Sequence, residues 1–264
     1  MREFSEQNLT AAVIERFENT RDPRLKKIMT SLVQHLHNFI RDAEPTFEEW
    51  VAGINYLTRT GQTCTDKRQE FILLSDTLGV SMLVDAINHR GREGVTETTV
   101  LGPFYVEGPP EVPLGSDVTG GLKGDPLYAE GTVCSPEGQP LASAIVDVWQ
   151  SDADGFYDVQ YADRTEPGLR ARLRTDANGR FYFWSVMPTC YPIPYDGPVG
   201  DMLKATRRHP YRPAHLHFLI AAQGYETLIT HLFVEGDQYL DSDAVFGVKK
   251  SGRNRKCWRA RCAC

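Results

Sequence analysis

The first third of the chain has the hydrophobic spacing of amphipathic helices. Between residues 23 and 41, eight apolar residues recur three or four positions apart, so they share one face of a helix. The run Thr46-Phe47-Glu48-Glu49 has the form of a capping box and predicts the start of a second helix. Residues 66–69 are expected to begin a third helix, which continues to about Ile87. Residues 1–95 are therefore predicted to form a helical domain.

From Thr98 onward, the pattern changes to short apolar segments separated by turn residues. Strands are expected at residues 127–134, 144–150, 170–175, 180–186, 215–222 and 226–234. Several short strands at this spacing are typical of an antiparallel β-sandwich. The predicted fold class is therefore α+β, with the helical domain followed by a β-sandwich domain at residues 96–251 that carries the chemistry.

Composition narrows the class of protein. The 264 residues are 41% hydrophobic and carry a formal net charge of -6, which argues against nucleic acid as the main partner. No apolar stretch approaches a membrane span, and the first residues lack the apolar core of a signal peptide. Cys64, Cys134 and Cys190 are far apart and form no disulfide framework. A cytoplasmic enzyme or binding protein is the expectation.

Residues 252–264 differ from the rest of the chain. This tail is basic and contains Cys257, Cys262 and Cys264, but it has no partnering histidine and no common zinc spacing. The alternatives are a metal knuckle or a nucleic-acid hook, and an atypical, non-native or frameshifted end. We favour the second interpretation.

Two pairs of residues are candidates for a metal site. In the run Arg212-Pro213-Ala214-His215-Leu216-His217-Phe218, the two histidines lie two apart in an expected strand, so both imidazoles project from one face. That geometry suits two neighbouring ligands of one metal, although a plain pair of partly buried histidines fits as well. Tyr157 follows a tight Asp-Gly turn, and Tyr191 lies in a proline-rich loop. Taken singly, each tyrosine fits an ordinary half-buried aromatic residue.

Taken together, the segments resemble the intradiol ring-cleaving dioxygenases, the ferric catechol 1,2-dioxygenase superfamily. The resemblance covers nearly the whole chain up to about Ser251. Its motifs, in order, are Leu101-Gly102-Pro103-Phe104-Tyr105, Asp147-Val148-Trp149-Gln150, Gly155-Phe156-Tyr157, Arg174-Thr175-Asp176, Pro188-Thr189-Cys190-Tyr191 and the Arg212–Phe218 run quoted above.

This resemblance implies one Fe(3+) per chain, bound by Tyr157, Tyr191, His215 and His217. It also implies that Tyr191 and Arg212 act in catalysis, on a small aromatic diol or triol and O2. Ligand chemistry agrees, because phenolate is a hard anionic ligand that suits a hard trivalent ion. A bound cation lowers the pKa of a phenol from its usual value of about 10.

Within the family, the chain looks most like the hydroxyquinol 1,2-dioxygenase branch. His231 stands where catechol enzymes typically place Gln. The residues that the resemblance places around the substrate are Leu73, Asp76, Val100, Leu101, Gly102, Pro103, Phe104, Ile193, Pro194, Arg212, His231 and Val245. Asp76 interrupts an apolar run and is the expected acceptor for the third hydroxyl of hydroxyquinol; an exposed helical aspartate is the alternative. Catechol and chlorocatechol remain alternative substrates.

The resemblance further implies a homodimer formed through the helical domain, with a phospholipid at the dimer interface. Two other classes of protein fit part of the pattern. A zinc-binding hydrolase or a cupin-like metal-binding module would use His215 and His217, and would need a third histidine or a carboxylate. A non-catalytic sugar-binding or adhesion sandwich would leave both histidines incidental.

Overall fold

The computed structural model describes residues 3–66, 68–90 and 95–250, and the atypical tail at 252–264 lies outside this range. The chain divides into two compact units, Met1–Arg59 and Thr60–Cys264. Among the described residues, no helix combines the length and the apolarity that a bilayer crossing requires.

The first unit contains two helices, α1 (Leu9–Glu15) and α2 (Pro23–Ala43), and the beginning of a third, α3 (Phe47–Thr63). Asp22 caps α2 by accepting the backbone N–H of Arg24 at 2.8 Å. The predicted capping box is confirmed: Thr46 N–H donates to the Glu49 carboxylate at 2.8 Å, and Glu49 N–H donates to the Thr46 hydroxyl at 3.2 Å.

The prediction of one long third helix is wrong. Two helices occupy this stretch, α4 (Glu70–Thr77) and α5 (Val80–Asn88). Gly79 separates them with a φ of 73°, a left-handed conformation that glycine adopts without the steric penalty of a Cβ atom. A further helix, α6 (Pro198–Ala205), was not predicted; its Val199 N–H donates to the buried Glu70 carboxylate at 3.1 Å, which ties α6 to the start of α4.

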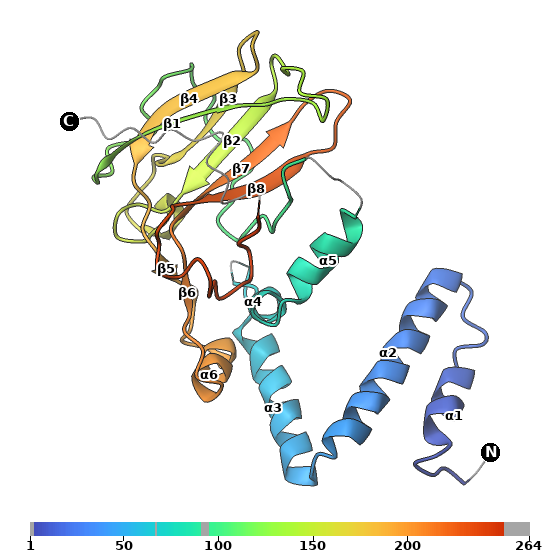
Figure 1. Ribbon diagram of the computed structural model, residues 1–264. Helices are drawn as coiled ribbons and strands as arrows, with labels where there is room; N and C mark the ends of the chain where they lie inside the picture. The colour runs from blue at the N-terminus through green and yellow to red at the C-terminus, as the bar shows by residue number, and fades with distance from the viewer. Residues whose placement is uncertain (1–2, 67, 91–94, 251–264) are drawn as a thin grey trace. The chain divides into compact units, whose positions relative to one another are not determined.

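All six predicted strands are present, and their ends differ from the predicted ones by two residues at most. They form a pair, β1–β4, and a four-stranded sheet in the order β3-β2-β7-β8, and every pairing is antiparallel (Figure 1). The bounds are β1 (Pro126–Thr132), β2 (Ile145–Gln150), β3 (Arg170–Arg174), β4 (Arg180–Val186), β7 (His215–Ala221) and β8 (Leu228–Phe233). Two shorter strands, β5 (Tyr191–Pro192) and β6 (Tyr211–Arg212), pair with each other. The α+β class is confirmed.

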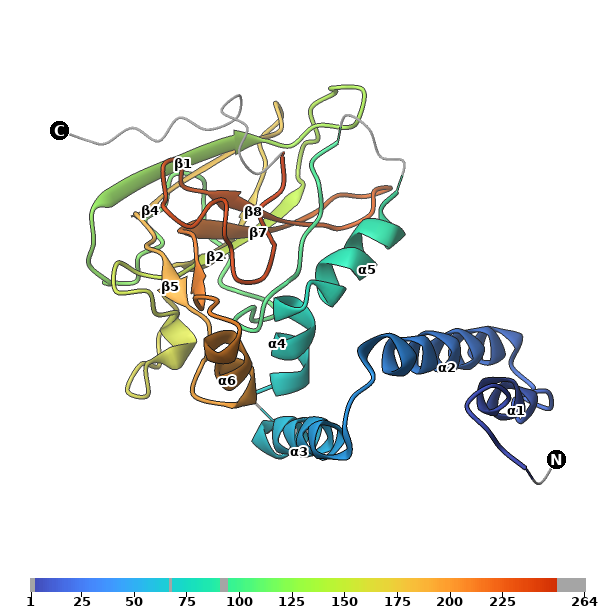
Figure 2. The ribbon, with the colours of Figure 1, turned by 60° about the horizontal axis from the view of Figure 1, so that its bottom comes forward.

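One hydrophobic core joins the β1–β4 pair to the four-stranded sheet. The two lie near each other in both views of the chain (Figures 1 and 2). Phe181 and Phe183 of β4 enter this core from one sheet, and Leu216 and Phe218 of β7 enter it from the other. Because side chains alternate along a strand, the histidines of β7 must project from the opposite face of the four-stranded sheet.

Arg170, at the start of β3, fixes the loop that follows β2. Its guanidinium donates to both carboxylate oxygens of Asp158 and, at 3.0 Å, to the carbonyl of Phe104. Burial alone would raise the pKa of Asp158, but the hydrogen bonds from Arg170 and from the Gly168 N–H outweigh it and lower that pKa. The pair therefore remains ionised inside the protein and holds Tyr157, the residue before Asp158, in place.

Arg170→Met is expected to lower the free energy of unfolding by about 3–5 kcal/mol, because the Asp158 carboxylate would stay buried without its cation. Arg174→Met is the matched control: it lies on the same strand, but both it and its partner Glu111 are half exposed, so the loss should be much smaller. Denaturant unfolding measures both values, and equal losses would contradict the structural role of Arg170.

Candidate metal centre

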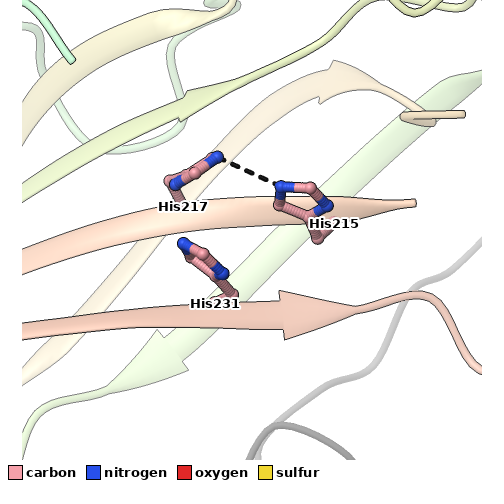
Figure 3. A group of neighbouring side chains, drawn as sticks. All are labelled: His215, His217 and His231. Atoms are coloured by element: carbon pink, nitrogen blue, oxygen red, sulfur yellow. Dashed lines mark hydrogen bonds between the residues drawn. The ribbon is translucent and has the colours of Figure 1, made fainter. Parts of the chain in front are cut away.

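Three buried histidines gather on one face of the four-stranded sheet. His215 and His217 project from β7, and His231 projects from β8, where it is paired with His217 (Figure 3). The Nε2 atoms of His215 and His217 are 3.1 Å apart, and one nitrogen from each ring lies within 4.8 Å of the others. In the part of the chain that the structure describes, this is the one group of His, Cys, Asp or Glu side chains arranged to hold a metal ion.

Both predicted tyrosines reach the same point. The Tyr157 hydroxyl lies 2.9 Å from Nε2 of His217 and 3.2 Å from the Tyr191 hydroxyl, which is 3.5 Å from Nε2 of His215. Ligands that bind a metal at about 2 Å and are neighbours in its coordination shell lie about 3 Å apart. The structure therefore brings the four sequence-predicted ligands together at separations that suit a single ion.

Local structure explains how the tyrosines arrive there. Gly155 has a φ of 87°, and a Cβ atom on it would lie 2.9 Å from Cβ of Tyr191, so the two loops approach closely only with glycine at this position. The Phe104 ring stacks on Tyr157 with centroids 4.4 Å apart. Tyr191 pairs with Arg212 in the β5–β6 ladder, which places a tyrosine and an arginine from distant parts of the chain side by side.

Trp149 also belongs to this centre. It lies in one of the motifs quoted above, but it was not predicted to be a site residue. Its indole stacks on the His217 imidazole at 4.7 Å with an interplanar angle of 18°. The contact follows from the β2–β7 register, in which Trp149 lies directly opposite His217. Packing on that side fixes the plane of the His217 ring.

Hydrogen bonds define which nitrogens of His215 and His231 carry protons. Nδ1 of His215 donates to the Pro213 carbonyl at 2.6 Å, so the lone pair is on its Nε2; a metal ion bound there would take the place of the Arg212 N–H that this nitrogen accepts. Arg212 approaches Nε2 of His215 at 3.1 Å and Nδ1 of His231 at 3.2 Å. Because a guanidinium only donates, Nδ1 of His231 must accept, and the proton of this neutral ring is on Nε2. A metal ion could bind Nε2 of His231 only if the proton moved to Nδ1, where it would face an N–H of Arg212. The arrangement therefore disfavours His231 as a third ligand.

Burial shifts the pKa values of the candidate histidine ligands and of Tyr157 in opposite directions. Burial, and next the Arg212 charge, lower the pKa of His215 to about 3, and burial lowers the pKa values of His217 and His231 well below the usual range. The imidazoles are therefore neutral near pH 7. Burial, and next the Tyr191 hydroxyl, raise the pKa of Tyr157 well above its ordinary value. A metal cation acts in the opposite direction and favours the phenolate.

Arg212 is 4% exposed, which rules out a surface salt bridge as its role. Its carboxylate partner is Asp243, which accepts from Nε at 3.2 Å and from Nη2 at 3.4 Å. Burial alone would raise the pKa of Asp243, but the Arg212 charge outweighs it and lowers that pKa. Asp243 was missed in the sequence, because a partner 31 residues away leaves no periodic or motif signal.

Several of the predicted substrate residues lie in or against two buried clusters, one of which contains Tyr157 and Tyr191. Leu101 and Phe104 pack against the cluster of Trp149, Tyr157 and Tyr191, and Gly102 lies against His217. Leu73, Ile193 and Val245 belong to a second buried cluster, and the Val100 carbonyl lies near His231. By contrast, Pro103 and Pro194 are exposed.

Asp76 is partly buried, and its Oδ1 atom is enclosed without a hydrogen-bond partner. Burial raises the pKa of Asp76, while the Ser81 hydroxyl and the Arg212 charge act in the opposite direction. A buried acceptor without a donor is costly for a protein to keep. Asp76 is therefore available to a ligand hydroxyl, and it is not the exposed helical aspartate of the alternative interpretation.

Known proteins match this chain over almost its full length. Residues 22–96 match the family model described as catechol dioxygenase N terminus, and residues 100–254 match the one described as dioxygenase. A 6-chlorohydroxyquinol 1,2-dioxygenase of Cupriavidus pinatubonensis is 57% identical, over 95% of this chain and 91% of its own length. A hydroxyquinol 1,2-dioxygenase of Corynebacterium glutamicum is 53% identical, over 93% of this chain and 82% of its own length.

The fold agrees with these matches. The structure of hydroxyquinol 1,2-dioxygenase from Pseudomonas putida has a TM-score of 0.91 and 52% identity, covering 94% of this chain and 86% of that one. The family is generally iron-dependent, and the histidine cluster described above can hold a metal ion. In fold, sequence and the residues gathered at its centre, the chain belongs to the intradiol ring-cleaving dioxygenases, a family of enzymes.

Proposed function

We propose that the protein is a ferric-iron intradiol dioxygenase that cleaves hydroxyquinol (1,2,4-trihydroxybenzene). The ring opens between the two carbons that carry adjacent hydroxyls, and both atoms of O2 enter the product, 3-hydroxy-cis,cis-muconate, which tautomerises to maleylacetate. The observation that carries this proposal is the convergence of two phenol oxygens and two imidazole nitrogens at Tyr157, Tyr191, His215 and His217. The relatives named for hydroxyquinol and its chlorinated form support the substrate.

The four side chains fit one ferric ion. Two anionic phenolates offset most of its charge, while two neutral imidazoles add none. When bound, the iron withdraws electron density from a diolate and so makes the ring reactive toward O2. We assign to Tyr191 a second role, because its oxygen lies at the edge of the donor set beside His215 and can accept a proton from the substrate.

Arg212 supplies a fixed positive charge beside the reacting ring. It is enclosed, always ionised, and held next to His215, so it needs no reorganisation when negative charge develops on the substrate. Asp76 is proposed to accept the third hydroxyl of hydroxyquinol. Catechol lacks that hydroxyl, and so would leave the enclosed Asp76 oxygen unpaired.

A catechol or chlorocatechol 1,2-dioxygenase is the alternative within the family. A zinc-binding hydrolase, or a cupin-like metal-binding module, is the alternative of another class. The cluster of His215, His217 and His231 favours this second alternative, because His231 is the third histidine that such a site needs. The proton on Nε2 of His231 and the placement of both tyrosines count against it.

Tyr157→Phe is expected to lose iron and colour, because it removes an anionic ligand. Tyr191→Phe should retain more iron but lose most of its turnover. Metal analysis and the visible absorption that tyrosinate-to-iron charge transfer gives would measure both. A colourless wild-type protein that contains zinc, or full visible absorption in both variants, would reject the iron site.

Asp76→Ala is expected to narrow the ratio of kcat/KM values for hydroxyquinol and catechol by roughly ten- to a hundredfold, which corresponds to about 1–3 kcal/mol. Asp76→Asn, which retains an acceptor oxygen, is the matched control and should show a smaller change. Steady-state kinetics on both diols decides the outcome. If the ratio is indifferent to Asp76, or the wild type prefers catechol or chlorocatechol, the substrate assignment fails while the intradiol assignment stands.

We further propose that residues 1–95 form a helical dimerisation and linker domain, that residues 96–251 form the β-sandwich catalytic domain, and that the protein is a cytoplasmic homodimer. The free thiols of Cys64, Cys134 and Cys190 support that location. The apolar stripe of α2 supports the dimer, since Leu32 and Phe39 on it are 53% and 59% exposed. A phospholipid between the helices would cover part of this surface.

Light scattering at micromolar concentration should report a dimer, and an organic extract of the protein should contain the lipid. A monomer in the light-scattering experiment would contradict the proposed dimer.

A further inference from the structure

The Arg212 guanidinium makes hydrogen bonds on two sides, to a carboxylate on one and to two histidines on the other. Nε and Nη2 face Asp243, at 3.2 and 3.4 Å, while Nη1 faces His215 at 3.1 Å and Nη2 also reaches His231 at 3.2 Å. These contacts account for four of the five N–H groups that a guanidinium possesses. The side chain can therefore turn only if it breaks contacts on both sides.

Asp243 is itself immobilised. It is 5% exposed, and its carboxylate accepts the backbone N–H of Val245 at 3.3 Å and that of Gly247 at 2.9 Å. The next residue, Ala244, donates its N–H to the Tyr211 carbonyl at 3.1 Å, which links this turn to β6 and hence to Arg212. The carboxylate that accepts from Arg212 is thus held in place by backbone N–H groups of a tight turn.

Charge gives this pair a consequence for the site. Without a carboxylate, the Arg212 cation would be buried next to His215, a proposed ligand of another cation, and would be repelled from it. The Asp243 anion on the far side of the guanidinium offsets that repulsion. Arg212 can then stay close to the ligands with its charge directed at the substrate.

We propose that Asp243 is a positioning residue of the ring-cleavage reaction, acting through Arg212. It sets the plane of the guanidinium, and thereby which N–H groups face His215 and His231. This inference rests on the role of Arg212 in the proposed function. The competing explanation is that Asp243 only holds the turn that carries Val245.

A double-mutant cycle distinguishes the two explanations. Asp243→Asn, measured per bound iron on hydroxyquinol, is expected to lower kcat by roughly ten- to a hundredfold in the wild-type background, with KM changed much less. In an Arg212→Gln background, the same substitution should lower kcat by less than about threefold, since no guanidinium remains to be positioned. Equal fold losses in both backgrounds would overturn the proposal.

Gly247→Ala tests the pair without removing a charge. A Cβ atom on Gly247 would lie 2.9 Å from Nη2 of Arg212 and 3.1 Å from Oδ2 of Asp243, so one of them must move. The expected loss of kcat should again shrink when Arg212 is Gln. Asp147→Asn is the control: Asp147 is a fully buried partner of another arginine, and its effect should be the same in both Arg212 backgrounds.

A second readout needs no catalysis. In iron-free protein, denaturant unfolding midpoints for the same cycle should also be non-additive, because the pair is present before substrate or iron binds. Coupling in unfolding without coupling in kcat would leave Asp243 a purely structural residue and overturn the proposal. An iron-loaded wild type that cleaves no diol would overturn the proposed function as well, whereas an active wild type with additive losses overturns only the role of Asp243.

Discussion

The two-residue period of β7 is the constraint on which the site depends. Leu216 and Phe218 are drawn into the core between the sheets, and this forces His215 and His217 onto the opposite face. A shift of one residue in the β2–β7 or β7–β8 register would exchange the two sets and place imidazoles in the apolar core. Hydrophobic burial therefore orients His215 and His217, although neither contributes to the core that does so.

Charge balance is the second organising theme. Around this face, three arginines each have a buried or nearly buried aspartate: Arg170 with Asp158, Arg172 with Asp147, and Arg212 with Asp243. The first and third pairs hold loops beside the sheet, and the second links the neighbouring strands β2 and β3. Such pairs add little net stability compared with apolar packing, but a broken one is costly, so they specify a single arrangement of the loops.

How much the sequence predicted depended on how local the signal was. Strands and their faces follow from alternation. His215, His217, Tyr157 and Tyr191 were identified because they lie in contiguous motifs that together resemble a known family; taken singly, neither tyrosine differs from an ordinary half-buried aromatic residue. Asp243 and Trp149 were not identified, because their contacts with the site are set by a long-range ion pair and by strand register. The break between α4 and α5 was missed because apolar spacing continues across Gly79, whose backbone conformation periodicity does not report.

The pairing of Tyr191 with Arg212 across β5 and β6 also closes a loop. The chain leaves the site after Tyr191, forms α6 and returns at Arg212, and Ile193 N–H meets the Pro210 carbonyl at 2.9 Å where the two ends come together. The entropic cost of closing a loop grows only slowly with the length of the loop. Because the two ends of residues 193–210 are tied together, a change within this segment has little effect on the β5–β6 pairing. A change in the length of the loops that flank α6 can therefore leave the tyrosine and the arginine in place relative to each other. Variation in this stretch is thus separated from the two residues that are proposed to carry the chemistry.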